Sequence, residues 1–336
     1  MSADANPSLR RLSPWPYILG LLVGAGYGLL FRLFAGGSFG RAPHPATTGS
    51  AATGVMTFSF LALGSFCIGM LASYTVERDE RRSVFLWLLA PWPPVFLACA
   101  LSVAFKLEGA ICLIFALPGA MFCSSIGGLI GGFLARRRKS RALVGCFALL
   151  PFLLAPAETM LTPPTETRTV ASEIAIHAPA ATVWKNVERV PAIAPNELRE
   201  TWAQRIGFPR PIEATLSYEG VGGVRHASFE RGLMFIETVT AWEPEQRLAF
   251  GIRADSAHIP TTTLDEHVTI GGRYFDVLDG EYRLEPLANG DTLLHLTSHQ
   301  RLSTNFNEYA GLWTDAVMQS LQTSILAVIQ HRCEHA

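Results

Sequence analysis

The segment GAICLIFALPGAMFCSSIGGLIGGFLA, residues 109–135, holds 27 consecutive residues without a charge, and the basic run RRRKSR, residues 136–141, follows it directly. A helix needs about 20 apolar residues to cross the hydrocarbon core of a bilayer, so this segment is long enough to span a membrane. Short segments rich in lysine and arginine stay on the cytoplasmic side. Together the two features predict an integral membrane protein and orient the part of the chain that follows.

Composition divides the 336 residues into two unlike parts. From residue 17 to residue 156 charged residues occur only in short clusters, whereas residues 158–336 have the mixed composition of a water-soluble fold. The formal net charge of −1 offers no basic surface for nucleic acid. Five of the six cysteines lie in the apolar part, which indicates neither a disulfide framework nor a metal site. We therefore expect no nucleic-acid partner, no metal and no cofactor.

The apolar part is predicted to form an all-α bundle of about five transmembrane helices. The predicted spans are 16–34, 54–74, 84–105, 109–135 and 142–157. The third contains PWPP at 91–94, and because proline removes a helical hydrogen bond and clashes with the preceding turn, we expect a kinked span. Two half-helices that enter from one side of the membrane are the alternative.

Basic residues predict how this bundle is oriented. With five spans, ten lysines and arginines fall on one side and three on the other, which places the N-terminus in the cytoplasm and the C-terminal domain outside it. The ten are Arg10, Arg11, Arg78, Arg81, Arg82, Arg136, Arg137, Arg138, Lys139 and Arg141, and the three are Arg32, Arg41 and Lys106. This predicts a protein of the bacterial inner-membrane type, provided that the fifth span crosses fully.

Glycines recur at four-residue spacing on two predicted spans. They are Gly20, Gly24 and Gly28 on the first, and the pairs Gly127/Gly131 and Gly128/Gly132 on the fourth. Such faces let helix backbones approach closely in lipid. We expect packing within the chain, and a homodimer contact through these faces is the alternative.

The sequence after residue 157 predicts a linker and an α+β domain. ETMLTPPTETRTVA, residues 158–171, is rich in proline and threonine, as linkers are, and residues 172–336 are assigned to the domain. Helices are expected through residues 183–187 and 196–206. Alternation of apolar and polar residues predicts strands at 173–177, 212–219, 222–230, 233–242, 246–254, 266–278, 280–287 and 292–302.

Turns and a terminal helix complete the predicted domain. Asp279-Gly280 and Asn289-Gly290 favour the positive φ angles of tight β-turns, so we expect antiparallel strands. Residues 305–333 carry apolar residues at intervals of three and four and predict an amphipathic helix, with Gln322 expected away from the core. A curved sheet wrapped around one helix tends to leave a cavity between the two.

Several stretches of this domain resemble a known family. IAIHAPAATVW (174–184), GVGGVR (220–225) and ETVTAWEPEQRLAF (237–250) are similar to segments of START-like helix-grip domains of the polyketide cyclase/dehydrase type, the SRPBCC superfamily. The resemblance covers residues 172–334. It implies a domain that binds a hydrophobic or amphipathic ligand, such as a lipid, polyketide, sterol or quinone, between the sheet and the terminal helix. Some members are cyclases or hydrolases and many have no known chemistry, while an anchor of several spans departs from the common soluble form.

Alternation along the strands indicates which side chains face the terminal helix. The residues on that face include Phe250, Tyr282, Leu296, Ser298 and Gln300. Most of them are expected in the core, and the polar members are candidate ligand contacts because a few polar groups on an apolar wall orient a ligand.

Arg225 and Glu237 lie on adjacent predicted strands, at positions that recur in the resembled family. A charge-assisted structural pair is the expected role, with contact to a ligand headgroup or acid–base chemistry as alternatives. Trp313, near the start of the terminal helix, is expected to anchor that helix or to close one end of the cavity. His226, His267, His295 and His299 share no metal-ligand spacing.

We therefore expect an N-terminal transmembrane bundle joined to a C-terminal helix-grip domain that binds a hydrophobic or lipid-like ligand at the membrane surface. Catalysis is not expected, because no arrangement of residues in the sequence specifies a reaction. The alternatives are a membrane-anchored cyclase or hydrolase acting on such a ligand, and a non-catalytic sensor or interaction module.

Overall fold

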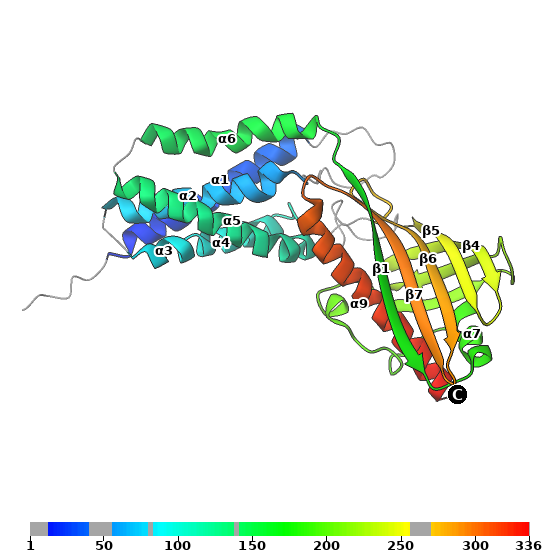
Figure 1. Cartoon of the computed structure of the whole chain (residues 1–336). Helices are drawn as coiled ribbons and strands as arrows, with labels where there is room; N and C mark the ends of the chain where they lie inside the picture. The colour runs from blue at the N-terminus through cyan, green and yellow to red at the C-terminus, as the bar shows by residue number, and fades with distance from the viewer. Residues whose placement is uncertain (1–12, 40–55, 80–82, 138–140, 256–269, 336) are drawn as a thin grey trace, which may run out of the picture. The chain divides into compact units, whose positions relative to one another are not determined.

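The computed structural model describes residues 13–39, 56–79, 83–137, 141–255 and 270–335. These residues form an N-terminal helical unit and a C-terminal unit built around a sheet (Figure 1). Residues 54–55 of the second predicted span and residues 266–269 of one predicted strand lie outside the described residues.

The N-terminal unit contains the apolar helices. Five helical segments are long and apolar enough to cross a membrane, as predicted: Trp15–Ala35, Ser59–Glu77, Val84–Ala104, Ala110–Arg136 and Arg141–Thr159. They belong to α1 (Trp15–Phe39), the π-helix η1 (Ser59–Gly64) with α2 (Ser65–Asp79), α3 (Val84–Leu89) with α4 (Trp92–Ala104), α5 (Ala110–Arg136) and α6 (Arg141–Thr159).

The third span is divided at its prolines into α3, which ends at Leu89, and α4, which begins at Trp92. Ala90 (φ −55°, ψ −27°) and Pro91 (φ −69°, ψ −22°) keep helical backbone angles between α3 and α4. Because these angles stay helical, the chain continues from one short helix into the next. Proline is also tolerated in the first turn of α4, where its missing N–H would have no helical partner. The break between the two helices lies where the prolines predict it, and the kink and the alternative of two half-helices stay predictions.

Glycines of α1, α2 and α5 allow close contact between helices of the same chain. A Cβ on Gly69 would lie 1.8 Å from the carbonyl oxygen of Ser124, and a Cβ on Gly127 would lie 1.9 Å from that of Phe66. The glycines with such contacts are Gly20, Gly24, Gly28, Gly69, Gly127, Gly128, Gly131 and Gly132. Packing within the chain therefore occupies the faces of these glycines, as expected, and a homodimer through them stays an untested alternative.

A carboxylate is buried where α2, α3 and α5 meet. Glu77 is 4% exposed, and it accepts hydrogen bonds from Trp87 Nε1 at 2.9 Å and from Arg136 Nε at 3.0 Å. The Arg136 guanidinium also lies 4.3 Å from the centroid of the Trp87 ring. A buried charge is tolerated when it is paired and hydrogen-bonded, so these three residues hold the ends of three helices together.

The C-terminal unit is an antiparallel sheet with a long terminal helix. Its strands are β1 (Thr165–Ile176), β2 (Pro211–Leu216), β3 (Val224–Phe229), β4 (Met234–Glu243), β5 (Arg247–Asp255), β6 (Phe275–Pro286) and β7 (Thr292–Ser303). Their order across the sheet is β1-β7-β6-β5-β4-β3-β2. The chain passes from one edge to the other through α7 (Ala180–Glu188) and α8 (Trp202–Arg205), and a short 3-10 turn, η2 (Glu230–Gly232), joins β3 to β4. The last helix, α9 (Asn307–Glu334), runs along the sheet (Figure 1).

Alternation along the strands gives the sheet an inner face toward α9 and an outer face. Two apolar clusters pack on the inner face. The first includes Ile176, Trp184, Leu248, Phe250, Tyr282, Leu284, Leu294, Leu296, Leu326 and Ile329. The second includes Ala227, Phe229, Phe235, Val277 and Val328. The predicted orientation of strands β5, β6 and β7 toward the helix is confirmed by this burial.

The first strand is longer than predicted. It pairs with β7 over its whole length, from Thr165 opposite Ser303 to Ile176 opposite Thr292. The sequence predicted a linker to residue 171 and a strand from residue 173. Residues 158–171 have a composition typical of linkers, but threonine also favours strands when a neighbouring strand is present. The start of β1 at Thr165 was therefore not predicted.

The hairpin predicted at Asp279-Gly280 is wrong. Both residues lie inside β6, just after a β-bulge that follows Val277. The glycine serves packing instead of a turn, because a Cβ at Gly280 would lie 2.7 Å from Cε2 of Phe250. The turn predicted at Asn289-Gly290 is confirmed, and Gly290 has a φ of +90°.

The helix predicted at 196–206 is also wrong, since only its last part is helical as α8. Glu197 accepts a hydrogen bond from the backbone N–H of Ala194 at 2.6 Å and another from Arg332 Nε of α9 at 2.7 Å. This link to α9 overrides the local helical pattern.

Candidate functional site

Two charged side chains meet on the inner face. Arg225 of β3 is directly opposite Glu237 of β4, and Arg225 Nη1 donates a hydrogen bond to Glu237 Oε2. Arg225 is 3% exposed and Glu237 is 6% exposed. Ile252 lies opposite Glu237 on β5 and packs against both apolar clusters. The ion pair therefore lies near the junction of the two clusters.

Aromatic rings lie beside the guanidinium. Arg225 Cζ is 5.7 Å from the ring centroid of Phe250 and 6.0 Å from that of Tyr282. Burial raises the pKa of the Glu237 carboxyl, and Arg225 opposes this shift. Burial also raises the pKa of the Tyr282 hydroxyl to about 12, again against the effect of Arg225. The phenol therefore stays protonated at neutral pH, in surroundings of low dielectric constant.

One donor of this polar centre lacks a partner. Arg225 Nε is buried and has no hydrogen-bond partner among the residues that the structure describes. Leaving a buried donor unpaired costs about 1–3 kcal/mol, and more when the group is charged. Ile252, opposite Glu237, is only partly buried, as are Met318 and Ile325, which pack against the same second cluster. The domain thus combines an available buried donor with apolar residues of the second cluster that keep some accessible surface.

Gln322 fastens α9 to β1 and β7. It was predicted to point away from the core, but it is 1% exposed. Its Nε2 donates to Ser298 Oγ and to the Val170 carbonyl oxygen, both at 3.1 Å, and its Oε1 accepts from Ser172 Oγ at 2.8 Å. Because its amide is fully hydrogen-bonded, Gln322 is a structural link, and Ser298 takes part in it.

A second polar group lies near the start of α9. Gln300 is 0% exposed and donates from Nε2 to Asp315 Oδ1 at 2.7 Å. Asp315 also accepts from Arg168 of β1, through Nε at 3.0 Å and Nη2 at 2.6 Å. Within the described chain, Gln300 Oε1 and Trp313 Nε1 have no partner. One buried acceptor and one buried donor therefore remain at this end of α9.

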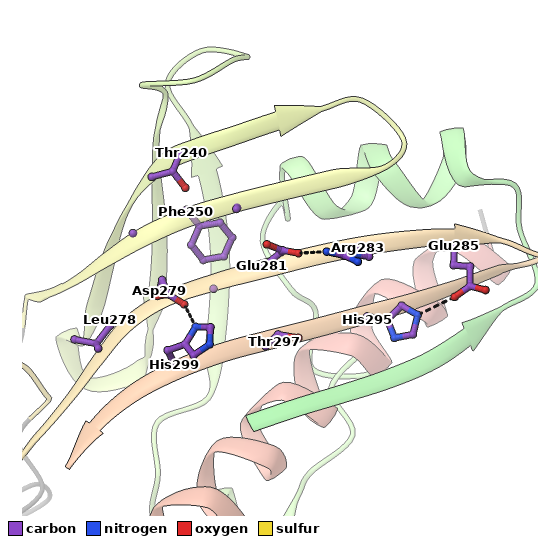
Figure 2. Close-up of a pocket in the computed structure, with 13 residues that line it drawn as sticks. Thr240, Phe250, Leu278, Asp279, Glu281, Arg283, Glu285, His295, Thr297 and His299 are labelled. Carbon is purple, nitrogen blue, oxygen red and sulfur yellow. Dashed lines mark hydrogen bonds and ion pairs between the residues drawn. The ribbon is translucent and has the colours of Figure 1, made fainter. Parts of the chain in front are cut away.

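A cavity lies on the outer face of the sheet. It has a volume of about 900 Å³, and Figure 2 shows side chains of β4 to β7 around it. Its lining residues are Thr240, Ala249, Phe250, Gly251, Leu278, Asp279, Gly280, Glu281, Arg283, Glu285, His295, Thr297 and His299. The sequence predicted a cavity on the inner face and missed this outer groove, because its shape depends on how four strands are aligned.

A seven-stranded antiparallel sheet that packs one face against a long C-terminal helix defines the architecture of this unit. The C-terminal half has a helix-grip fold. The predicted combination of a helical, apolar N-terminal half with this fold is confirmed.

Comparisons with solved structures match this half. A START superfamily protein from Mycobacterium smegmatis is 12% identical, with 50% of this chain and 97% of that chain covered and a TM-score of 0.33. A truncated norcoclaurine synthase from Thalictrum flavum is 13% identical, with coverage of 51% and 97% and a TM-score of 0.32. The Aha1 dimer from Colwellia psychrerythraea is 14% identical, with coverage of 50% and 96% and a TM-score of 0.29. No family model and no curated protein matches the sequence. Such distant likeness transfers no function to this chain.

The structure brings only some of the candidate residues together. Those that form the polar centre are Arg225, Glu237, Phe250 and Tyr282. Those elsewhere are Leu296 in the first apolar cluster, Ser298 and Gln300 against α9, and Trp313 outside both clusters. Sequence reasoning missed Arg168, Asp315 and Gln322, whose partners are distant in the sequence. Across the described ranges, no group of three or more His, Cys, Asp or Glu side chains is placed to hold a metal ion.

Proposed function

We propose that the START-like domain binds a hydrophobic or lipid-like ligand between its sheet and α9, at the surface of the membrane that the apolar helices cross. The unpaired Nε–H of Arg225 carries this proposal, because it is a charged donor buried in a domain whose second apolar cluster has partly buried side chains. A ligand that supplies an acceptor there would remove the cost of the unpaired group.

The geometry favours an amphipathic molecule whose polar end accepts hydrogen bonds. A carboxylate, phosphate or carbonyl oxygen would meet Arg225 Nε, while an apolar chain would lie along Ile252, Met318 and Ile325. Burying apolar surface contributes roughly 25 cal/mol per Å², so the chain would supply much of the affinity. The domain is tethered to the bilayer, and this raises its effective concentration at the lipid surface.

Native mass spectrometry of the full chain released from detergent micelles tests this proposal. The wild type should retain a bound lipid that the double variant Arg225→Met/Glu237→Leu loses, since the variant removes the donor without leaving a lone buried charge. Lipids held by the transmembrane helices should persist in both proteins. The matched control removes the exposed pair Arg210–Glu200 by Arg210→Gln/Glu200→Gln and should retain the lipid. Equal lipid retention by wild type and double variant would contradict the proposal.

A further inference from the structure

The outer groove is shaped by two β-bulges and by small residues. The alignment of β4 with β5 shifts at Thr240, and that of β6 with β7 shifts at Leu278. Bulges bend a strand and increase its local twist, so they change the shape of the outer face here. The floor is formed by small side chains of β5, and a Cβ added at Gly251 would meet nothing within 4 Å. The groove is therefore open to a molecule that lies flat on the sheet.

Hydrogen-bonding groups surround this floor. His299 Nδ1 lies 2.6 Å from Asp279 Oδ1, which leaves the imidazole Nε2 without a partner among the described residues. Glu281 accepts from Arg283 Nη2 at 3.1 Å and from Arg247 Nη2 at 2.9 Å. Figure 2 shows Asp279, Glu281, Arg283 and His299 on one face of the sheet. Donors and acceptors thus lie around the small residues Ala249 and Gly251, with Phe250 and Leu278 also in the lining.

The charges of the groove disfavour an anionic ligand. Its lining contains the carboxylates Asp279, Glu281 and Glu285 but only one arginine, Arg283. Each carboxylate is already paired with a histidine or an arginine, so a cationic ligand would have to displace an existing partner. The groups that remain available are uncharged acceptors and hydroxyls, including the hydroxyl of Thr297 on β7.

We propose that the outer groove binds an uncharged polyhydroxylated ligand of the carbohydrate type. A hydroxyl both donates and accepts, and so it can bridge neighbouring donors and acceptors such as Arg283 and His299 Nε2. The C–H face of a sugar ring would lie on Ala249 and Gly251. The volume of about 900 Å³ lies in the range of sites for small molecules. This site is separate from the inner-face site, and its ligand is either a free sugar or the sugar headgroup of a glycolipid.

The test is saturation-transfer NMR with the full chain in a detergent that has no sugar headgroup. The probes are free glucose, galactose, mannose and N-acetylglucosamine, and a second arm presents a monoglycosyl diacylglycerol in nanodiscs. At least one probe should bind the wild type. Gly251→Leu fills open space and should abolish binding. Thr297→Val should weaken it roughly two- to tenfold, the effect of losing one hydrogen bond.

The matched control is Thr167→Val, an exposed residue of β1 that does not line the groove. It should leave sugar binding unchanged. Binding in only one arm identifies the source of the sugar and supports the proposal. Absence of binding in both arms, or binding that survives Gly251→Leu, overturns it. Lipid retention at the inner face should not change in Gly251→Leu, so failure of one proposal is distinguishable from failure of the other.

Discussion

The buried pair Arg225–Glu237 predicts that single and double substitutions differ sharply in stability. Glu237→Ala would leave a guanidinium buried without its counter-charge, and Arg225→Met would leave a lone carboxylate among the apolar clusters. Removing one partner of a buried pair typically costs about 3–5 kcal/mol. Arg225 is 3% exposed and Glu237 is 6% exposed, so water cannot replace a partner that is removed. We therefore expect each single variant to lose about 3–5 kcal/mol of stability.

The double variant Arg225→Met/Glu237→Leu should behave differently. Replacing a buried pair by apolar residues of similar volume is often neutral or stabilising by about 1–4 kcal/mol, because the cost of desolvating two charges disappears. The two single effects would add if the residues were independent. We therefore expect the double variant to be more stable than either single variant, with a coupling energy of several kcal/mol.

Hydrogen–deuterium exchange of the full chain in detergent measures how each of these variants changes the local stability around Arg225 and Glu237. Exchange of peptides from β3 and β4 reports the free energy of opening of that region, without assuming two-state unfolding of a membrane protein. The exposed pair Glu200–Arg210, with side-chain exposures of 43% and 44%, is the control, and Glu200→Gln should change the opening free energy by about 1 kcal/mol or less. Single variants that cost as little as this control, or a double variant as unstable as the sum of the singles, would refute the reasoning.

Further predictions concern packing, pH and orientation. Gly280→Ala should destabilise the domain by about 1–3 kcal/mol, because the added Cβ meets the Phe250 ring. Gly251→Ala adds its Cβ in open space and should cost less when the two variants are compared by chemical denaturation. The hydrogen bond from Arg332 lowers the pKa of Glu197 from 4.5 to about 2. The ionised Glu197 carboxylate therefore stabilises the fold fully above pH 4.5, and this stabilisation is lost as the pH falls toward about 2. In Glu197→Gln the free energy of unfolding should depend less on pH between these two values. A C-terminal alkaline phosphatase fusion should be active and a green fluorescent protein fusion dark, and the reverse result would place the domain in the cytoplasm.

The sequence was sufficient to predict those structural features that depend on the residues of one segment and not on its contacts with distant ones. The apolar segments are long enough to span a membrane whatever surrounds them, and the break between α3 and α4 lies at the prolines that predict it. Alternation placed Phe250 and Tyr282 on the inner face, and the glycine at 290 adopts the positive φ that its turn requires.

Local information failed where a distant contact decides. The dipeptide Asp279-Gly280 has the composition of a turn, yet the ring of Phe250 on the neighbouring strand requires the glycine. Gln322 is polar but buried, because groups of β1 and β7 satisfy its amide. The outer groove depends on bulges in two strand pairs, and a single strand does not reveal such alignment.

Photo-crosslinking tests the proposed inner-face site most directly. The full chain in nanodiscs would be exposed to a fatty acid that carries a diazirine in its chain, and the labelled peptides would be mapped by mass spectrometry. The account predicts labels on α9 near Met318 and Ile325 and on β5 near Ile252, and their loss in Arg225→Met/Glu237→Leu. Labels confined to the transmembrane helices would contradict it.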